Sequence, residues 1–235
     1  MRILTLFFIP LVQCLNLKKS FIASLIGTSL SLTPTQLVQP VYANPHIPNI
    51  QNDAEFLKTR VTLDRNNIYV YGSITPDSCE QLKNHLNNLD YNGRLFKLQY
   101  NKDPPPINLH IQSGGGSLLN ALYIVDLIEL LDTPVNTYVD GYSASAASLL
   151  GVVGDKRYMS KNSMIMIHQL SSGKEGKYQE LSDDQQNMQL LMNKIKTIYL
   201  RKTTIPYIQL NEILNHDLWL DADTCKKYGL IDEII

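Results

Sequence analysis

Three polar side chains in the second half of the chain have the types that acyl transfer requires, and they occur in the order Ser, His, Asp. Ser145 lies in a run of small residues after a predicted strand, so its hydroxyl is expected at the N-terminus of a helix. The helix dipole and free backbone N–H groups stabilise a developing oxyanion at such a place. His168 ends an alternating apolar stretch, and Asp217 shortly precedes Trp219. Together they supply a nucleophile, a general base and an orienting carboxylate.

Each of these residues also has an interpretation without chemistry. Serine-rich helix starts are common N-caps, and Asp217 can simply cap the turn that follows it. A histidine at the end of a strand, such as His168, is more often a structural residue than a catalytic one. A Gly-x-Ser-x-Gly nucleophile elbow that begins at Gly141 is excluded, because its fifth position holds Ser145 and that fold places its acid before its histidine.

The elements that must hold these residues alternate between strands and helices. Apolar β-branched runs predict strands, whereas apolar residues at helical spacing predict helices. The predicted strands cover 68–71, 108–111, 135–139, 157–159, 164–168 and 230–235. The predicted helices cover 76–93, 118–131, 144–150 and 181–202, with a last one between Asp221 and Gly229. This alternation predicts an α/β domain with largely parallel strand pairing, and the proline-rich stretch 94–106 is expected to be a loop.

Composition and charge exclude several classes of protein. The 235 residues carry 21 Lys and Arg against 22 Asp and Glu, which gives a net charge of −1. A near-neutral chain lacks the basic surface of a nucleic-acid-binding protein, so no nucleic-acid partner is expected. The three cysteines, Cys14, Cys79 and Cys225, are too scattered for a disulfide framework or a zinc site. The five histidines show no ligand spacing either, so the sequence predicts no metal.

The first part of the chain differs in composition from the rest. No acidic residue occurs before Asp53, and an apolar run at 3–14 is followed by Lys18, Lys19 and a hydroxyl-rich apolar stretch. These two units are typical of a targeting leader that ends after Ala43. They resemble the bipartite leaders of plastid proteins in algae with complex plastids, which predicts a location in the plastid stroma. The alternative is a signal anchor that directs the chain to the secretory pathway or to a membrane.

Several motifs around the three chemical residues resemble the proteolytic subunit of the ATP-dependent Clp protease. The motifs are IYVYGSI, the glycine loop LHIQSGGG, and the segments GYSASAA, MIHQL, DLWLDA and YGLID. They occur in the family's order between about Asn67 and Ile234. The resemblance implies a Clp protease/crotonase-like ββα-repeat fold with a protruding handle helix. It divides the chain into the leader (1–43), a linker and N-terminal segment (44–66) and a Clp protease-like catalytic domain (67–235).

The resemblance also implies a role for individual residues. Ser145 takes the position of the nucleophile, His168 that of the general base and Asp217 that of the third triad member. The N–H groups of Gly116 and Ala146 take the positions of the oxyanion hole. An unfolded polypeptide would bind as an added β-strand, a mode that reads backbone more than side chains and gives loose specificity. The residues expected to flank that strand are Gly115, Gly116, Ser117, Leu170, Ser171 and Gly173.

The implied activity is that of a serine endopeptidase that works inside a closed chamber in protein quality control. Two stacked seven-membered rings, built from this chain or from paralogous subunits, would pair through the long helix that starts near Leu181. An AAA+ unfoldase would use ATP and feed in unfolded proteins, so no cofactor is expected on this chain. The alternative is a catalytically silent ring subunit, although such subunits lose triad residues. Acyl-CoA hydratases of the same superfamily lack the serine triad, and signal peptide peptidases pair serine with lysine, so neither fits.

The sequence departs from the family's pattern at several positions. Gly114 replaces a proline in the glycine loop, so a more flexible loop is expected. Ala146 replaces the methionine after the nucleophile, which alters the primary specificity pocket. His216 replaces a basic residue that helps to link ring pairing to activity. Asn108 and His110 replace aromatic residues of the chaperone-docking pockets, so altered unfoldase docking is expected.

Overall fold

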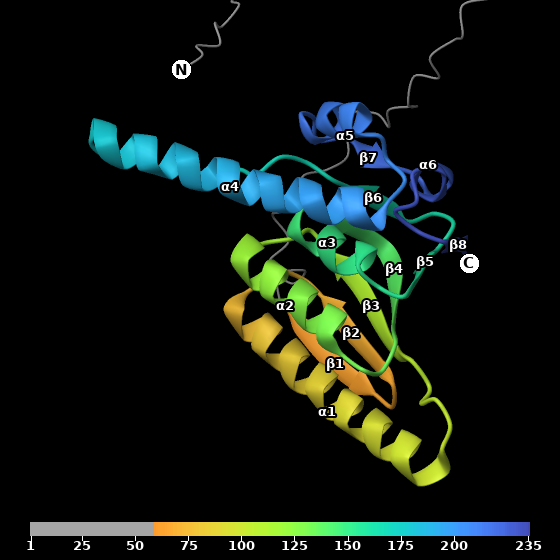
Figure 1. Cartoon of the computed structure of the whole chain (residues 1–235). Coiled ribbons are helices and arrows are strands. Elements are labelled where there is room, and N and C mark those ends of the chain that lie inside the picture. Colours follow the sequence, from red (N-terminus) through yellow and green to blue (C-terminus); the bar gives the residue numbers. More distant parts are fainter. Residues whose placement is uncertain (1–58) are drawn as a thin grey trace, which may run out of the picture. The chain divides into compact units, whose positions relative to one another are not determined.

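The computed structural model of the chain describes residues 59–235 (Figure 1). The predicted leader (1–43) and most of the predicted linker and N-terminal segment (44–66) lie outside these residues. Between residues 59 and 235, none of the helices combines the length and the apolar character that crossing a membrane requires.

Within the described residues, eight strands form one mixed sheet. They are β1 (Arg60–Asp64), β2 (Asn67–Tyr71), β3 (Ile107–Ser113), β4 (Val135–Ala144), β5 (Lys156–Met159), β6 (Met164–Met166), β7 (Trp219–Leu220) and β8 (Glu233–Ile234). Strands β2, β3, β4, β5 and β8 lie in this order and are parallel, while β1 pairs antiparallel with β2 at one edge. Strand β6 pairs with the end of β4, and β7 pairs antiparallel with β6. The predicted α/β fold with largely parallel pairing is confirmed.

The alternation of apolar and polar residues decides which face of the sheet is covered. In β3 the side chains of Ile107, Leu109 and Ile111 are buried, whereas Asn108 and His110 between them are partly exposed. Three helices cover the buried face, as Figure 1 shows. They are α1 (Pro76–Tyr100), α2 (Leu118–Leu130) and α3 (Ala146–Val152).

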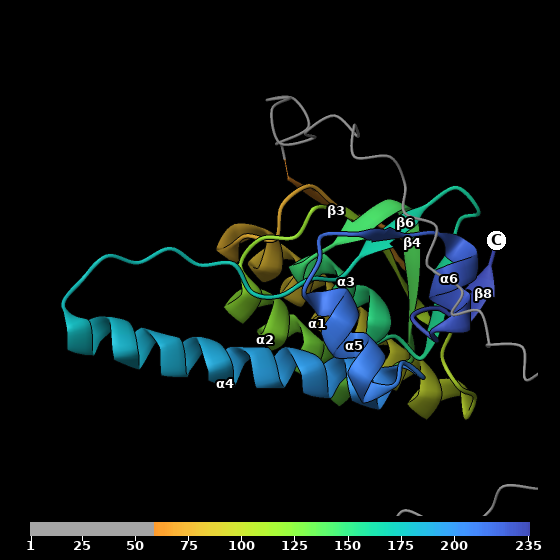
Figure 2. The same ribbon diagram turned by 90° about the horizontal axis from the view of Figure 1, so that it is seen from above.

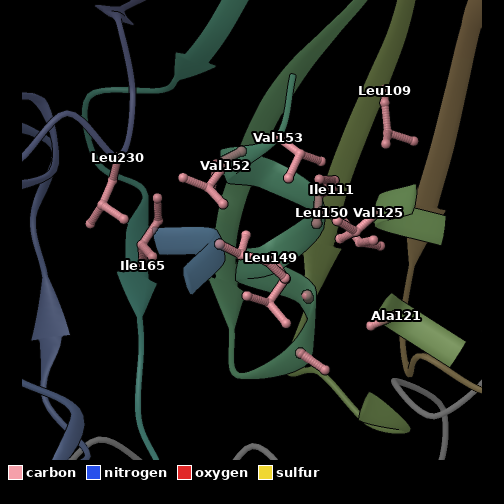
Figure 3. Packing of buried hydrophobic residues seen from close by; sticks show 14 of the residues in the cluster. Leu109, Ile111, Ala121, Val125, Leu149, Leu150, Val152, Val153, Ile165 and Leu230 are labelled. Carbon is pink, nitrogen blue, oxygen red and sulfur yellow. The ribbon is translucent and has the colours of Figure 1, made fainter. Parts of the chain in front are cut away.

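Helix α3 lies at the centre of the core, and all of its residues are buried. Leu150 lies close to Ile111 of β3 and Val125 of α2, while Val152 lies on the side of Ile165 of β6 (Figure 3). Full burial of one such side chain stabilises a fold by about 1.5–3 kcal/mol. The packing therefore fixes the start of α3, which is the place where the sequence analysis expects the nucleophile.

The predicted handle is helix α4 (Tyr178–Lys202), which extends well beyond the sheet (Figures 1 and 2). Only its C-terminal half is anchored in the core, through the buried side chains of Ile195, Ile198 and Tyr199. Most side chains of the outer half are exposed. Two short helices follow, α5 (Tyr207–Leu214) and α6 (Ala222–Lys227).

Helix α6 begins where the sequence predicts it. The Asp221 carboxylate caps the helix by accepting the Thr224 N–H at 2.8 Å. Hydrogen bonds from Thr224 lower the pKa of Asp221, which keeps the cap ionised. Gly229 follows the helix with a φ of 68°, a backbone conformation that favours glycine.

Helix α1 is longer than predicted. It continues through Gly93, where the sequence analysis expected its end, and reaches Tyr100. Gly93 is required inside the helix, because a Cβ at this position would overlap the Thr133 side chain. The first part of the predicted loop 94–106 is therefore helical, and a glycine that signals a helix end here serves close packing instead.

Several other elements also differ from those that the sequence predicts. Strand β1 lies inside the segment 44–66 that the sequence assigned to a linker and N-terminal segment, so the folded sheet begins before residue 67. Val61 is the one buried residue of β1, so this strand lacks the alternating pattern that predicts strands. Strand β4 runs past residue 139, where the predicted strand ends, to Ala144, because its last residues pair with β6. Strand β7 and helix α5 were not predicted.

Candidate active site

Ser145 joins the end of β4 to the start of α3. Its N–H donates to the Met166 carbonyl of β6 at 2.9 Å, so strand pairing continues up to this residue. Its φ of 55° and ψ of −129° lie outside the regions that L-residues normally occupy. Such strained conformations persist only where the surrounding structure enforces them, and they are common at active sites.

His168 and Asp217 are brought together by the antiparallel pair β6 and β7. In this pair Met166 lies opposite Trp219. When the same register is continued, His168 lies opposite Asp217. Directly opposite side chains of antiparallel strands are close neighbours, so the contact follows from the register.

The side chains of Ser145, His168 and Asp217 form one hydrogen-bonded chain. His168 Nε2 lies 2.7 Å from Ser145 Oγ, and His168 Nδ1 lies 2.7 Å from Asp217 Oδ1. A carboxylate only accepts, so Nδ1 of a neutral imidazole carries the proton and Nε2 accepts from the Ser145 hydroxyl. The His168 side chain is 19% exposed, whereas that of Asp217 is 75% exposed. This connectivity suits the removal of a proton from a serine hydroxyl.

Comparison with known proteins assigns the described part of the chain to a family. Residues 59–235 match the family model of the Clp protease. The chain belongs to the Clp protease family. The matched region covers the whole described sheet, the handle α4 and the three side chains above. It also includes β1, in agreement with a folded region that begins before residue 67.

In this Clp protease family member, the glycine loop after β3 runs directly against the turn at Ser145. A Cβ at Gly115 would lie 2.7 Å from Ser145 Cβ and 3.0 Å from the Ala146 nitrogen. Gly115 has a φ of 95° and Gly116 a φ of 146°, conformations that L side chains rarely adopt. Within residues 59–235, neither the Gly116 N–H nor the Ala146 N–H donates a hydrogen bond to another group. Free backbone donors at this place are what an oxyanion hole requires.

A set of hydrogen bonds holds the glycine loop in shape. The Gly115 N–H donates to Ser113 Oγ at 3.1 Å, and the Ile74 N–H donates to the Gly115 carbonyl at 2.8 Å. The Ser117 N–H in turn donates to the Ile74 carbonyl at 2.8 Å. This role of Ser113 was not predicted, although a serine shortly before a turn glycine is a known signal for such a bond. Gly114 has open space where a Cβ would lie.

A cavity of about 340 Å³ opens beside the Ser145 hydroxyl. Its apolar wall includes Leu118, Leu149 and Ile195, a lining that suits an apolar side chain. The residues predicted to flank substrate that line this cavity are Gly116, Leu170 and Ser171, and those outside its lining are Gly115, Ser117 and Gly173. Ala146 also lines the cavity, and its short side chain leaves room where the family's pattern has a methionine.

His110, one of the departures in the docking region, lies on the sheet face opposite the helices. Its ring stacks between Tyr69 and Tyr138, with centroid distances of 4.7 Å and 4.6 Å. His110 Nδ1 lies 2.9 Å from Asp140 Oδ2, and the Tyr71 hydroxyl donates to the same oxygen at 2.9 Å. Burial and the Asp140 carboxylate together raise the pKa of Tyr71 to about 12. This face is therefore aromatic even though the expected aromatic residue at position 110 is a histidine.

The other candidate groups do not compete with Ser145 as nucleophile. Cys79 and Cys225 are buried free thiols, and burial raises the pKa of both. Protonated, buried thiols are poor nucleophiles at neutral pH. His216 lies beside Asp217 in sequence, but its Nε2 faces a Glu212 carboxylate oxygen at 3.6 Å. Between residues 59 and 235, no group of three His, Cys, Asp or Glu side chains has the arrangement of a metal site.

Proposed function

We propose that this chain is an active serine endopeptidase with Ser145 as nucleophile, His168 as general base and Asp217 as the third triad member. The observation that carries the proposal is the unbroken chain of hydrogen bonds through the His168 ring, each 2.7 Å long. The free N–H groups of Gly116 and Ala146 and the adjoining cavity support it.

The proposed reaction is acyl transfer. His168 Nε2 takes the proton of Ser145 Oγ as this oxygen attacks the carbonyl carbon of a peptide bond, and Asp217 stabilises the imidazolium that forms. The N–H groups of Gly116 and Ala146 hold the oxyanion, and loss of one such donor typically slows catalysis by about 10²–10³. His168 then protonates the leaving amine, and water attacks the acyl-enzyme with His168 again as the base.

The proposed substrate is an unfolded polypeptide in an extended conformation. It would lie between the glycine loop and the segment after His168, which both contribute residues to the cavity lining. Gly114 and Gly173 have no atom within van der Waals contact of a Cβ, so both flanks leave space for a bound strand. Binding by strand addition reads the backbone and gives loose specificity, with the apolar cavity wall favouring an apolar side chain next to the cleaved bond.

The proposed assembly is a stack of two seven-membered rings made of this chain or of paralogous subunits. Helix α4 supports it, because Tyr178 and Leu181, three residues apart on one face of this projecting helix, are 85% and 41% exposed. Apolar side chains gathered on an exposed surface are typical of a protein contact. In this arrangement an AAA+ unfoldase hydrolyses ATP and delivers unfolded proteins to the chamber, and this chain itself needs no cofactor.

The proposed location is the plastid stroma. The acid-free composition of residues 1–43 supports it, with two successive apolar units and small residues before the expected cleavage point. A fluorescent protein fused after residue 66 would test the location, and plastid fluorescence is the expected result. Fluorescence in the secretory pathway or at another membrane would contradict it.

Labelling with a fluorophosphonate tests the proposed activity on the assembled full-length chain. We expect the wild type to be labelled and the Ser145→Ala variant to remain unlabelled. Ser160→Ala removes a hydroxyl in the turn after β5, outside the cavity lining, and should keep full labelling. Absence of labelling in assembled wild-type protein would identify a catalytically silent ring subunit instead.

A further inference from the structure

A buried pair of hydroxyl groups joins the handle helix to the residue that carries the proposed nucleophile. Tyr199 in α4 and Ser148 in α3 are only 2% and 3% exposed, and their side-chain oxygens lie 2.7 Å apart. Ser148 Oγ also lies 2.5 Å from the carbonyl oxygen of Ser145. Neither hydroxyl takes part in the reaction proposed above, and sequence reasoning singled out neither residue.

The number of protons fixes the direction of these two hydrogen bonds. The Ser145 carbonyl oxygen only accepts, so Ser148 uses its single hydroxyl proton on that bond. Tyr199 must therefore donate its own proton to Ser148 Oγ. Burial raises the pKa of the Tyr199 phenol above its ordinary value, which keeps this donor protonated at neutral pH.

The carbonyl at the end of this chain of bonds belongs to a residue in a strained conformation. Ser145 has a positive φ of 55°, which a residue with a side chain keeps only where its surroundings enforce it. Its N–H is bound by Met166, and its carbonyl accepts both the N–H of Ser148, at 3.1 Å, and the Ser148 hydroxyl. Because Cβ is attached to the same backbone, a rotation of Ser145 would move Oγ relative to Nε2 of His168.

We propose that Tyr199 is a positioning residue, which acts through Ser148 to hold the Ser145 hydroxyl in line with His168. The arrangement ties the nucleophile to the anchored half of α4, so a shift of this helix reaches Ser145 through two hydrogen bonds. The inference rests on the proposed peptidase activity. It concerns the rate of the chemical step and not substrate binding. Tyr199 lines the cavity, but its hydroxyl is bound to Ser148, so loss of the hydroxyl alone leaves the rest of the side chain in place.

The first experiment is the Tyr199→Phe variant of the full-length protein, which keeps the ring and removes only the donor. We expect kcat for a short fluorogenic peptide to fall about tenfold with KM unchanged, and the rate of fluorophosphonate labelling to fall by the same factor. The variant lacks one hydrogen bond, and its Ser145 Oγ is expected to be slightly displaced. Tyr91→Phe is the matched control, since Tyr91 is 56% exposed on α1, and its kinetics should equal those of the wild type.

The second experiment asks whether Tyr199 acts only through Ser148. Ser148→Ala should lower kcat at least as much as Tyr199→Phe, because it removes the bond to the Ser145 carbonyl directly. The double variant should then be no slower than Ser148→Ala alone, whereas independent effects would multiply to about a hundredfold. Size-exclusion chromatography on each variant restricts the comparison to fully assembled protein.

The outcomes separate this inference from the proposed function. An unchanged kcat in Tyr199→Phe, losses that multiply in the double variant, or a rise in KM alone would each overturn the positioning role while leaving the peptidase activity established. Assembled wild-type protein that neither takes the label nor cleaves peptide would overturn the peptidase proposal, and the positioning role with it.

Discussion

The Asp217 carboxylate, just before β7, lies 2.7 Å from the His168 ring, just after β6, yet three quarters of the Asp217 side chain is open to solvent. Water screens an exposed charge, so an exposed carboxylate stabilises an imidazolium less than a buried one does. In the single subunit, the two hydrogen bonds of His168 therefore differ in how well they are shielded from solvent. The bond between His168 and Ser145 is largely covered, and the bond to Asp217 is not.

We predict that Asp217→Asn lowers peptide cleavage less than the other triad variants do. The amide keeps the size of the side chain but loses the charge and no longer fixes the His168 tautomer, so kcat should fall by about 10⁴, against about 10⁶ for Ser145→Ala or His168→Ala. Steady-state cleavage of a short peptide by the assembled variants measures this order. A loss in Asp217→Asn as large as that in Ser145→Ala would mean that assembly covers the carboxylate, and full activity would remove Asp217 from the triad.

The sequence singled out Ser145, His168 and Asp217, but it did not predict the strand that brings two of them together. Ser145 follows one predicted strand and His168 ends another, so their place at one edge of a parallel sheet could be expected. Asp217 reaches His168 only because Trp219 and its neighbour form β7, and a strand of two residues carries no periodicity to detect. The local pattern therefore offered Asp217 only as a candidate orienting carboxylate, and the resemblance to the Clp protease family assigned it as the third triad member.

Packing that joins distant parts of the chain was equally invisible in the sequence. Gly93 signals a helix end in local terms, but in the fold it makes room for Thr133, forty residues further along the chain. Tyr199 and Ser148 each fall on the apolar side of a helix, where the sequence pattern assigns them no special role. Only their contact in the core shows that the two hydroxyl groups form a hydrogen bond. Local propensity cannot anticipate such pairs, because the contact depends on how whole elements pack.

Two adjacent glycines of the loop should respond in opposite ways to alanine. Gly115→Ala forces a Cβ to within 2.7 Å of the Ala144 carbonyl oxygen at a φ of 95°, so we expect the loop to shift and peptide cleavage to fall at least tenfold. Gly114→Ala meets open space in the free protein and reduces the freedom of the unfolded chain, which should stabilise the protein by about 0.4–1 kcal/mol, and any loss of activity should appear as a higher KM because Gly114 lines the cavity. Chemical denaturation and peptide cleavage of the two variants measure both effects, and equal behaviour would contradict the loop geometry.

The contact between Gly93 of α1 and Thr133 predicts that a second substitution, at Thr133, restores stability lost in Gly93→Ala. Gly93→Ala improves helix propensity by about 1 kcal/mol, but its Cβ overlaps Thr133 Oγ1, so we expect a net loss of about 1–3 kcal/mol in unfolding free energy. Thr133→Ala removes the overlapping atoms while the Thr133 backbone N–H keeps its bond to Asp90 at 2.8 Å. The double variant should therefore be more stable than Gly93→Ala alone in denaturant titrations. A double variant at least as unstable as the sum of the single variants would show that Gly93 matters for another reason.

The ion pair between Arg157 and Asp232 predicts a pH dependence of stability. Arg157 binds the Asp232 carboxylate through Nε at 3.0 Å and through Nη2, and its Nη1 donates to the carbonyls of Lys202 and Gly229, so the pair joins β5 to the C-terminal segment and to the end of α4. The hydrogen bond from Arg157 lowers the pKa of Asp232 below its ordinary value of about 3.9.

The pair therefore stabilises the fold fully above about pH 4, and this contribution is lost as the pH falls through the lowered pKa of folded Asp232. We expect Asp232→Asn to cost about 1 kcal/mol at pH 7, a modest value because the carboxylate is 41% exposed, and to cost progressively less below pH 4. Urea titrations of both proteins across this range measure the difference. Glu233→Gln removes the exposed neighbouring carboxylate, and its difference from the wild type should not shrink in the same way. A difference for Asp232→Asn that stays constant down to strongly acidic pH would mean that the Asn side chain replaces the hydrogen bonds and that the charge of Asp232 contributes nothing.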